Sequence, residues 1–370
     1  MKKTKLLIIL LILPLITSCW DERLLKDTRI VYLAGFDTAE NNNYLTTTII
    51  RDIIISESNR GHTSVSDELV MGKGSTMSET GLKINRSVTG DFDLAKARVI
   101  MFGKEAAEKD IYRLLDGIYR NPRVNLHSKF ALADNTANEI ITHLANDEMQ
   151  KGEFLYEMIA SGEENTEIQE ITLRSIRTYL FDDGKDFTVP VLSLDEEDSK
   201  VKVTGAALFH DRSFTGETLN PDEITMLLLL MGRRSEQAIL TKKLDGEDNV
   251  QVSFNVRNVS KKKNLEIKEK IHVDIELELV VEVVDYPPDH LEKQEAIDHL
   301  NKQLSEILTE RADALFKKLQ TNQSDLLGLG RDLMAYHPDI WKEIKGENYY
   351  EEIVVNPKVK VKVGKINVVN

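Results

Sequence analysis

The sequence IHVDIELELVVEVVD, residues 271–285, alternates hydrophobic and polar side chains over most of its length. The same period of two extends back to Leu265 with one slip at Glu269, and it also occurs over residues 250–256. Because successive side chains of a strand point to opposite faces, the pattern predicts one long strand over residues 265–283, with one buried and one solvated face. Such strands are typical of an antiparallel sheet.

The residues that follow predict a long helix and a last strand. Tyr286-Pro287-Pro288 ends the alternating stretch, since proline offers no backbone N–H to a sheet. Hydrophobic side chains then recur at helical spacing: Leu291, Ile297, Leu300, Leu304, Ile307, Leu308, Ala312, Leu315 and Leu319. Alternation returns at Val359, Val361, Val363 and Ile366. Residues 226–370 are therefore predicted to form an α+β domain in which one long helix packs on an antiparallel sheet.

The N-terminal half has a different order of elements. Residues 98–103 indicate a buried strand and residues 105–119 a helix, and residues 124–133 indicate a further strand before a helix that runs through Leu144. Strands that alternate with helices favour adjacent parallel strands. We predict a multidomain α+β protein whose N-terminal α/β-layer domain covers residues 19–188.

A small β-rich middle region is predicted between these two domains. Residues 189–192 and 201–209 have the composition of paired strands, and the acidic run 195–198 separates them. Pro221 opens the helix that carries the hydrophobic stretch 226–231. We therefore expect a connecting domain over residues 189–225.

The first nineteen residues have the layout of an export signal. Lys2, Lys3 and Lys5 precede a hydrophobic run, Leu6–Ile16, that is shorter than the roughly 20 residues of a membrane-spanning helix. Ile16-Thr17-Ser18-Cys19 is similar to a bacterial lipobox, which implies a signal peptide over residues 1–18 and a diacylglyceryl group on Cys19. Two acyl chains suffice for stable membrane anchoring.

Charge and cysteine content exclude several classes of function. Cys19 is the single cysteine, so the chain contains neither an internal disulfide nor a cysteine metal site. The formal charge of −14 becomes −17 once the three lysines of the signal are removed. A surface this acidic repels phosphate backbones, which argues against nucleic-acid binding.

The sequence contains no recognisable catalytic or cofactor motif. Residues 72–76, GKGST, lack the residue order of a phosphate-binding loop, and the acidic run 195–198 lacks the glycine and final glutamate of a calcium loop. The eight histidines are scattered, and no Gly-x-Ser-x-Gly is present. We therefore expect neither an enzyme nor a bound metal or cofactor.

Several stretches, in order along the chain, resemble one family. They are Cys19-Trp20-Asp21 after the lipobox, residues 99–107 with Gly103, residues 204–209 with Gly205 and Phe209, residues 216–219 with Gly216, residues 325–330 with Gly328 and Gly330, and finally Pro338 and Trp341. These resemble the Ger(x)C lipoproteins, the C subunits of the nutrient germinant receptors of endospore-forming bacteria.

The resemblance implies a non-catalytic subunit, with no cofactor, on the outer face of the cell or spore inner membrane. Its partners would be the membrane itself, through diacylglyceryl-Cys19, and the A and B membrane subunits of the receptor, with no established small-molecule ligand. Apart from Cys19, the matched positions are expected to be structural: Trp20, Asp21, Gly103, Gly205, Phe209, Gly216, Gly328, Gly330, Pro338 and Trp341.

Two other classes of function stay open at this point. One is a solute-binding lipoprotein that presents a small ligand to a membrane transporter, which would need a concave site between domains. The other is an exported enzyme, for which the sequence supplies no nucleophile or metal motif.

Overall fold

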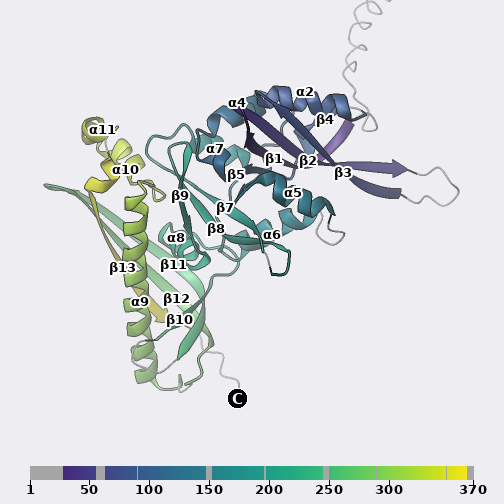
Figure 1. The fold of residues 1–370 in the computed structure, drawn as a ribbon. Helices are drawn as coiled ribbons and strands as arrows, with labels where there is room; N and C mark the ends of the chain where they lie inside the picture. The colour runs from purple at the N-terminus through teal and green to yellow at the C-terminus, as the bar shows by residue number, and fades with distance from the viewer. Residues whose placement is uncertain are drawn as a thin grey trace, which may run out of the picture.

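The computed structural model describes residues 28–55, 63–89, 91–146, 152–195, 197–244, 250–288, 291–346 and 348–364. Cys19, Trp20 and Asp21 lie outside these described residues. The chain forms two lobes, each built on its own sheet, and we call residues 28–219 the N-terminal lobe and residues 220–364 the C-terminal lobe (Figure 1).

The N-terminal lobe is built on a sheet of nine strands. Eight follow the order β3-β2-β1-β5-β6-β7-β8-β9, and β4 pairs beside them with the start of β1. Strands β1, β5, β6 and β7 are parallel neighbours, whereas β1-β2-β3 and β7-β8-β9 are antiparallel. The bounds are β1 Thr28–Ala39, β2 Asn43–Ile55, β3 Thr63–Gly74, β4 Asp91–Asp93, β5 Val99–Gly103, β6 Lys129–Ala133, β7 Thr188–Leu194, β8 Val201–His210 and β9 Ser213–Leu219.

Helices cover both faces of this sheet. In β5, Val99 and Met101 belong to one hydrophobic cluster, and Ile100 and Phe102 belong to the other, so consecutive side chains point into opposite cores. This explains why β5 reads as an unbroken hydrophobic run. Helices α5 (Ala137–Asn146) and α6 (Gly152–Glu164) cover one face, and α2 (Met77–Ser87), α3 (Lys104–Ala107), α4 (Tyr112–Tyr119) and α7 (Leu173–Tyr179) cover the other.

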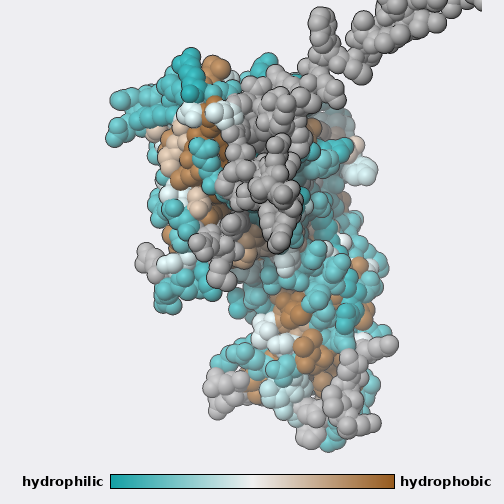
Figure 2. Space-filling model, turned by 90° about the vertical axis from the view of Figure 1, so that its right-hand side faces the viewer, coloured by the Kyte–Doolittle hydropathy of each residue, from teal (hydrophilic) through white to brown (hydrophobic). Residues whose placement is uncertain are grey.

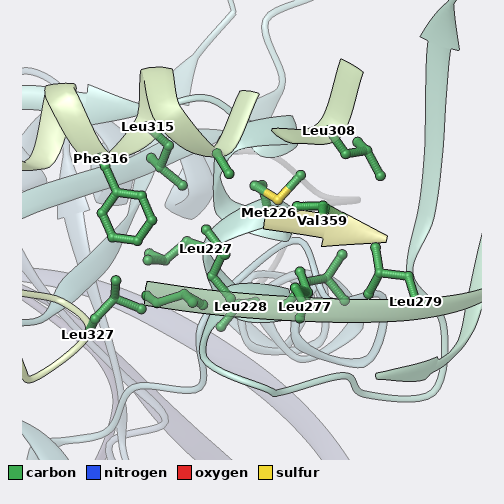
Figure 3. Packing of buried hydrophobic residues seen from close by; sticks show 14 of the residues in the cluster. Met226, Leu227, Leu228, Leu277, Leu279, Leu308, Leu315, Phe316, Leu327 and Val359 are labelled. Carbon is green, nitrogen blue, oxygen red and sulfur yellow. The ribbon is translucent and has the colours of Figure 1, made fainter. Parts of the chain in front are cut away.

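The C-terminal lobe is a four-stranded sheet with the order β10-β11-β12-β13. The strands are β10 Ile239–Lys243, β11 Gln251–Ile267, β12 Ile271–Asp285 and β13 Ile353–Val363, and the helices are α8 Pro221–Leu230, α9 Gln294–Thr321, α10 Leu329–Tyr336 and α11 Pro338–Ile344. Helix α9 packs on the sheet as predicted, and Figure 3 shows Leu308, Leu315 and Phe316 directed toward α8, β12 and β13. Each such buried side chain contributes about 1.5–3 kcal/mol to folding.

The structure corrects two details of the predicted C-terminal sheet. Residues 265–283 form two strands joined by a tight hairpin, because Ile267 pairs directly with Ile271 and the slip at Glu269 is the turn. The last strand, β13, pairs in parallel with β12, so the sheet is mixed. The reason is the long helix between these strands, since it carries the chain from the last residue of β12 back to the end of the sheet where β12 begins.

The predicted small β-rich region over residues 189–225 does not form a separate sheet. Strands β7, β8 and β9 extend the first sheet through the pairing of β7 with β6. Ala206, Leu208 and Leu219 at the end of that sheet pack into the same hydrophobic cluster as α8 and the second sheet. The two lobes therefore share a core, and the three domain boundaries remain a prediction.

The predicted helix over residues 105–119 is divided in two. The backbone N–H of Tyr112 donates to Asp110 at 2.9 Å, and that of Ile111 donates to the carbonyl of Arg212, which interrupts the helix between α3 and α4. None of the helices within the described ranges combines the length and hydropathy needed to cross a membrane. The face shown in Figure 2 is largely hydrophilic, with smaller groups of hydrophobic residues on both lobes.

Candidate functional site

The loop between α9 and α10 carries a fully buried carboxylate, that of Asp325, which is 0% exposed. It accepts hydrogen bonds from the backbone N–H groups of Gly328, Leu329 and Gly330 at 2.8, 3.0 and 2.7 Å. These are the N–H groups at the start of α10 that have no partner within the helix. The hydroxyl of Tyr349 donates to the same carboxylate at 3.1 Å. Gly328 has a φ of +71°, a left-handed conformation that favours glycine.

The same loop bonds across to the N-terminal lobe. The backbone N–H of Asp325 donates to Asp186 Oδ2 at 2.8 Å, and the N–H of Asp186 donates to the carbonyl of Asp325 at 3.0 Å. The hydroxyl of Ser324 donates to the carbonyl of Phe209 at 2.7 Å. Asp186 Oδ1 also accepts from the N–H of Asp211 at 2.9 Å. We call Asp186, Ser324, Asp325 and Tyr349 the junction node, because their hydrogen bonds join the two lobes.

Two glycines let the backbones of the lobes approach each other. A Cβ added at Gly330 would lie 2.7 Å from the hydroxyl of Tyr349 and 3.0 Å from Cα of Gly184. At this point the N–H of Arg331 donates to the carbonyl of Gly184 at 2.9 Å. A larger residue at position 330 would therefore separate the lobes or displace Tyr349.

Aromatic side chains pack beside the node. Trp341 is 6% exposed, and its ring lies edge-on to that of Tyr349 with centroids 5.0 Å apart. Trp341, Tyr349 and Tyr350 line a hollow of about 380 Å³ together with His210 and Gln323. Tyr349 of the junction node is therefore one wall of this hollow.

Burial dominates the electrostatics of the node. It raises the pKa of Asp325 to about 6, although the N–H groups of Gly330 and Leu329 act in the opposite direction. Burial likewise raises the pKa of Tyr349, so its hydroxyl stays protonated and remains a donor. The hydrogen bond to Asp186 raises the pKa of His210.

Within the described residues, one group of side chains has the composition of a metal site: Asp186, His210 and Asp211, whose ligand atoms lie within 4.8 Å of one another. Both oxygens of Asp186 already accept backbone N–H groups, from Asp211 and Asp325. The hydrogen-bonding role in the junction therefore explains this cluster without an ion.

The structure brings together part of the residues predicted from sequence. Phe209, Gly328, Gly330 and Trp341 all lie at the junction, and Pro338 occupies the first turn of α11, one turn before Trp341. Phe209 also stacks on Phe187 with centroids 4.8 Å apart.

The other matched glycines lie in the N-terminal sheet, away from the junction. Gly103 ends β5, and a Cβ there would collide with the carboxylate of Asp37. A Cβ at Gly205 would collide with the carbonyl of Leu219 in the neighbouring strand, and Gly216 has a φ of +92° in β9. These three glycines therefore allow close backbone packing or a positive φ within the N-terminal lobe.

Sequence reasoning missed the polar centre of the junction. Asp325 lies within the matched stretch 325–330, but the resemblance points to the glycines after it, and nothing in the sequence pattern marks Asp186 or Tyr349. The available signal is an aspartate followed by glycines at the third and fifth positions, since a short polar side chain just before a helix start can accept the N–H groups that have no partner within the helix.

Comparison with known proteins places the chain in a family. Residues 21–194 match the family described as "Spore germination protein N-terminal domain", and residues 204–367 match "Spore germination B3/GerAC like, C-terminal". The spore germination protein GerQC of Bacillus cereus is 21% identical over 359 residues, which cover 96% of this chain and 97% of that protein. The spore germination protein KC of Bacillus subtilis is 21% identical over 95% of this chain and 93% of its own length.

A solved structure shows the same fold. The crystal structure of the GerBC protein superposes with a TM-score of 0.58 at 15% sequence identity, covering 93% of this chain and all of that one. Both family models together span nearly the whole described chain, on both sides of the junction. The chain therefore belongs to the Ger(x)C family of spore germination proteins.

Proposed function

We propose that this chain is the lipid-anchored, non-catalytic C subunit of a nutrient germinant receptor. It acts in spore germination at the outer face of the spore inner membrane, beside the A and B membrane subunits. The full-length match to relatives named as spore germination proteins supports this assignment, and so does the lipobox that ends at Cys19.

The observation that carries the proposal is the role of the matched stretch 325–330 in the junction. Its aspartate and glycines build the contact between the lobes, and the carboxylate of Asp325 is fully occupied by N–H and O–H donors. These residues maintain the relative placement of two lobes, which is what a subunit that docks on partners requires. They do not supply a free acid, base or nucleophile.

The anchor would hold the N-terminal lobe close to the bilayer. Strand β1 begins at Thr28, nine residues after Cys19. Even fully extended, those nine residues span only about 30 Å. The N-terminal lobe is thus the part that the lipid would keep nearest to the membrane.

Co-purification tests the assignment. Tagged protein is isolated from detergent-solubilised spore membranes, and bound proteins are identified by mass. We expect a polytopic permease-like protein and a second membrane subunit to co-purify with the wild type, and less of both with Cys19→Ala, which cannot be lipidated. Lipidated protein recovered without either partner would contradict the proposal.

The hollow beside Trp341 and Tyr349 favours a second candidate, a solute-binding lipoprotein that presents a small ligand to a transporter. Its volume of about 380 Å³ lies in the range of small-ligand sites, and aromatic and polar side chains both line it. A thermal-shift screen of nutrients against the chain tests this candidate. A rise in Tm with one compound, lost in Trp341→Ala, would support it.

A further inference from the structure

The two edges of the C-terminal sheet differ in whether their outward backbone groups have partners. At β13, side chains of α9 accept outward backbone N–H groups at 2.8–3.0 Å. The donor and acceptor pairs are Val359 with Thr309, Val361 with Ser305, and Val363 with Asn301. The three acceptors are four residues apart, so they lie on one face of α9. Pro357, in the same alternating set of β13, has no N–H. Helix α9 therefore closes this edge to a further strand.

At β10, the outward backbone groups have no such partners. The carbonyl of Ala238 accepts the N–H of Val256 at 2.9 Å, so Ala238 and every second residue after it bond to β11. The backbone groups of Ile239 and Thr241 therefore point away from β11. Within the described ranges, β11 is the only strand that pairs with β10. The outer side of β10 is thus a free edge that can accept an added strand.

A hollow of about 430 Å³ lies on the core-facing side of this free edge. Leu240 and Lys242 of β10 line it together with parts of α8 and α9, and none of the described residues that line it belongs to β11, β12 or β13. Met226 and Leu315 add to its hydrophobic surface. Because side chains of a strand point alternately to the two faces of a sheet, those of an added strand that face the core would enter the hollow.

The charged groups of the hollow leave one cation without a counter-charge. Lys242 is 6% exposed and forms an ion pair with Asp222. Glu223 forms an ion pair with Lys318 at 3.0 Å. Arg311, which is exposed on α9, forms no ion pair with a described side chain. Because the other charges cancel in pairs, an acidic side chain of an incoming segment would be attracted to Arg311.

A second copy of the chain does not suit this edge. The sequence of β10 is ILTKK, which contains two lysines and no acidic residue, so the β10 of another copy offers no counter-charge to Arg311. The formal charge of −14 also makes two copies repel each other. The free edge instead fits a different protein with an extended segment that carries hydrophobic and acidic side chains.

We propose that β10 is the docking edge for an extended segment of a partner protein, which adds to the C-terminal sheet as a fifth strand. The segment places a hydrophobic side chain in the hollow beside Leu240 and an acidic side chain at Arg311. Main-chain hydrogen bonds to β10 supply affinity, and the side chains in the hollow supply specificity. This inference rests on the proposed function, in which the partner is a membrane subunit of the receptor.

Substitution of Thr241 tests the free edge. Thr241→Pro removes an outward N–H and keeps the bonds to β11, and proline is tolerated on edge strands. Thr241→Val is the matched control, because both variants lose the hydrogen bond to Ser253 but valine keeps the N–H. Each tagged, lipidated chain is isolated from detergent-solubilised spore membranes, and the bound membrane subunits are quantified by mass spectrometry. We expect Thr241→Val to recover as much as the wild type, and Thr241→Pro about tenfold less.

Photocrosslinking gives a second readout that does not require the proline variant to fold. A photoreactive amino acid in place of Thr241 should join the chain to an extended segment of a membrane subunit, which is mapped by mass. The same amino acid in place of Lys360, on the closed edge at β13, should give no such product.

The outcomes separate this inference from the proposed function. Wild-type recovery of the membrane subunits by a folded Thr241→Pro chain, or a crosslink from position 360 but not from 241, would overturn the docking edge alone. A crosslink at position 241 between two copies of the chain would overturn it in favour of self-association. If the wild type recovers no membrane subunit, the proposed function itself is contradicted.

Discussion

Two buried aspartates serve as acceptors for helix N-termini, one inside the N-terminal lobe and one between the lobes. Asp37, 4% exposed, lies near the end of β1 and accepts the N–H groups of Ala137 and Asn138 at the start of α5, both at 2.8 Å. Asp325 accepts three N–H groups at the start of α10, and its own backbone also exchanges hydrogen bonds with Asp186. Burial raises the pKa of both carboxyl groups.

The difference between them lies in what each carboxylate holds in place. Asp37 fixes the start of one helix to an interior strand of its own sheet, beside Gly103. Asp325 fixes a helix, an aromatic residue and the neighbouring lobe at once. The same chemistry therefore stabilises a single lobe in one case and the relative placement of two lobes in the other.

Alanine substitution of each aspartate should give the largest effects and separate the two roles. Asp325→Ala leaves three N–H groups and a hydroxyl buried without an acceptor, so we expect the free energy of unfolding to fall by more than about 3 kcal/mol. Asp37→Ala removes the acceptor of only two N–H groups, one of them part-buried, and should cost about 1–2 kcal/mol. Urea denaturation of both variants measures the two losses of unfolding free energy. Equal losses would contradict the proposed difference between the two aspartates.

Gly330→Ala should break the close approach of the lobes without removing a charge. The added methyl group meets the hydroxyl of Tyr349 and the backbone of Gly184, so we expect a loss of about 1–3 kcal/mol. Gly81→Ala is the matched control, because a Cβ there lies 3.8 Å from Phe92 and alanine favours the helix by about 1 kcal/mol. Destabilisation by both substitutions, measured by urea denaturation, would show that the effect is not specific to the junction.

The titration of Asp325 should make stability depend on pH. Its pKa of about 6 in the folded protein lies above the ordinary value, so its contribution is present in acid and is lost as pH rises through 6. From pH 7 to pH 5, the wild type should gain about 1 kcal/mol relative to Asp325→Asn. The raised pKa of His210 acts in the same direction in both proteins and cancels in this difference. Parallel curves for the two proteins would exclude Asp325 as the titrating group.

The smallest effect is expected for the ion pair at the rim of the junction. Arg331 pairs with Asp182 across the lobes, but the arginine side chain is 46% exposed. Arg331→Ala should therefore cost less than about 1 kcal/mol, and the loss should shrink at high salt. Arg120→Ala, which removes an exposed pair with Asp116 inside the N-terminal lobe, is the control. A loss of unfolding free energy comparable to that of Asp325→Ala would show that this ion pair contributes as much to the junction as the buried carboxylate.

Local patterns in the sequence predicted the elements but not how they meet. The alternation over β12 and the helical spacing over α9 are short-range signals; α9 formed as predicted, whereas the predicted strand over residues 265–283 is divided by a hairpin between β11 and β12. The parallel direction of β13 and the joining of β7 to β6 depend on the path of the chain through space, which periodicity does not record. For the same reason the glycines of residues 325–330 were identifiable as turn residues, whereas the pairing of Asp325 with Asp186, 139 positions apart, was not.

Differential scanning calorimetry of the mature chain tests most directly whether the junction node joins the two lobes into one cooperative unit. The account predicts a single unfolding transition for the wild type and for Asp37→Ala, and two separate transitions for Asp325→Ala. Two transitions in the wild type, or a single transition in Asp325→Ala, would contradict it.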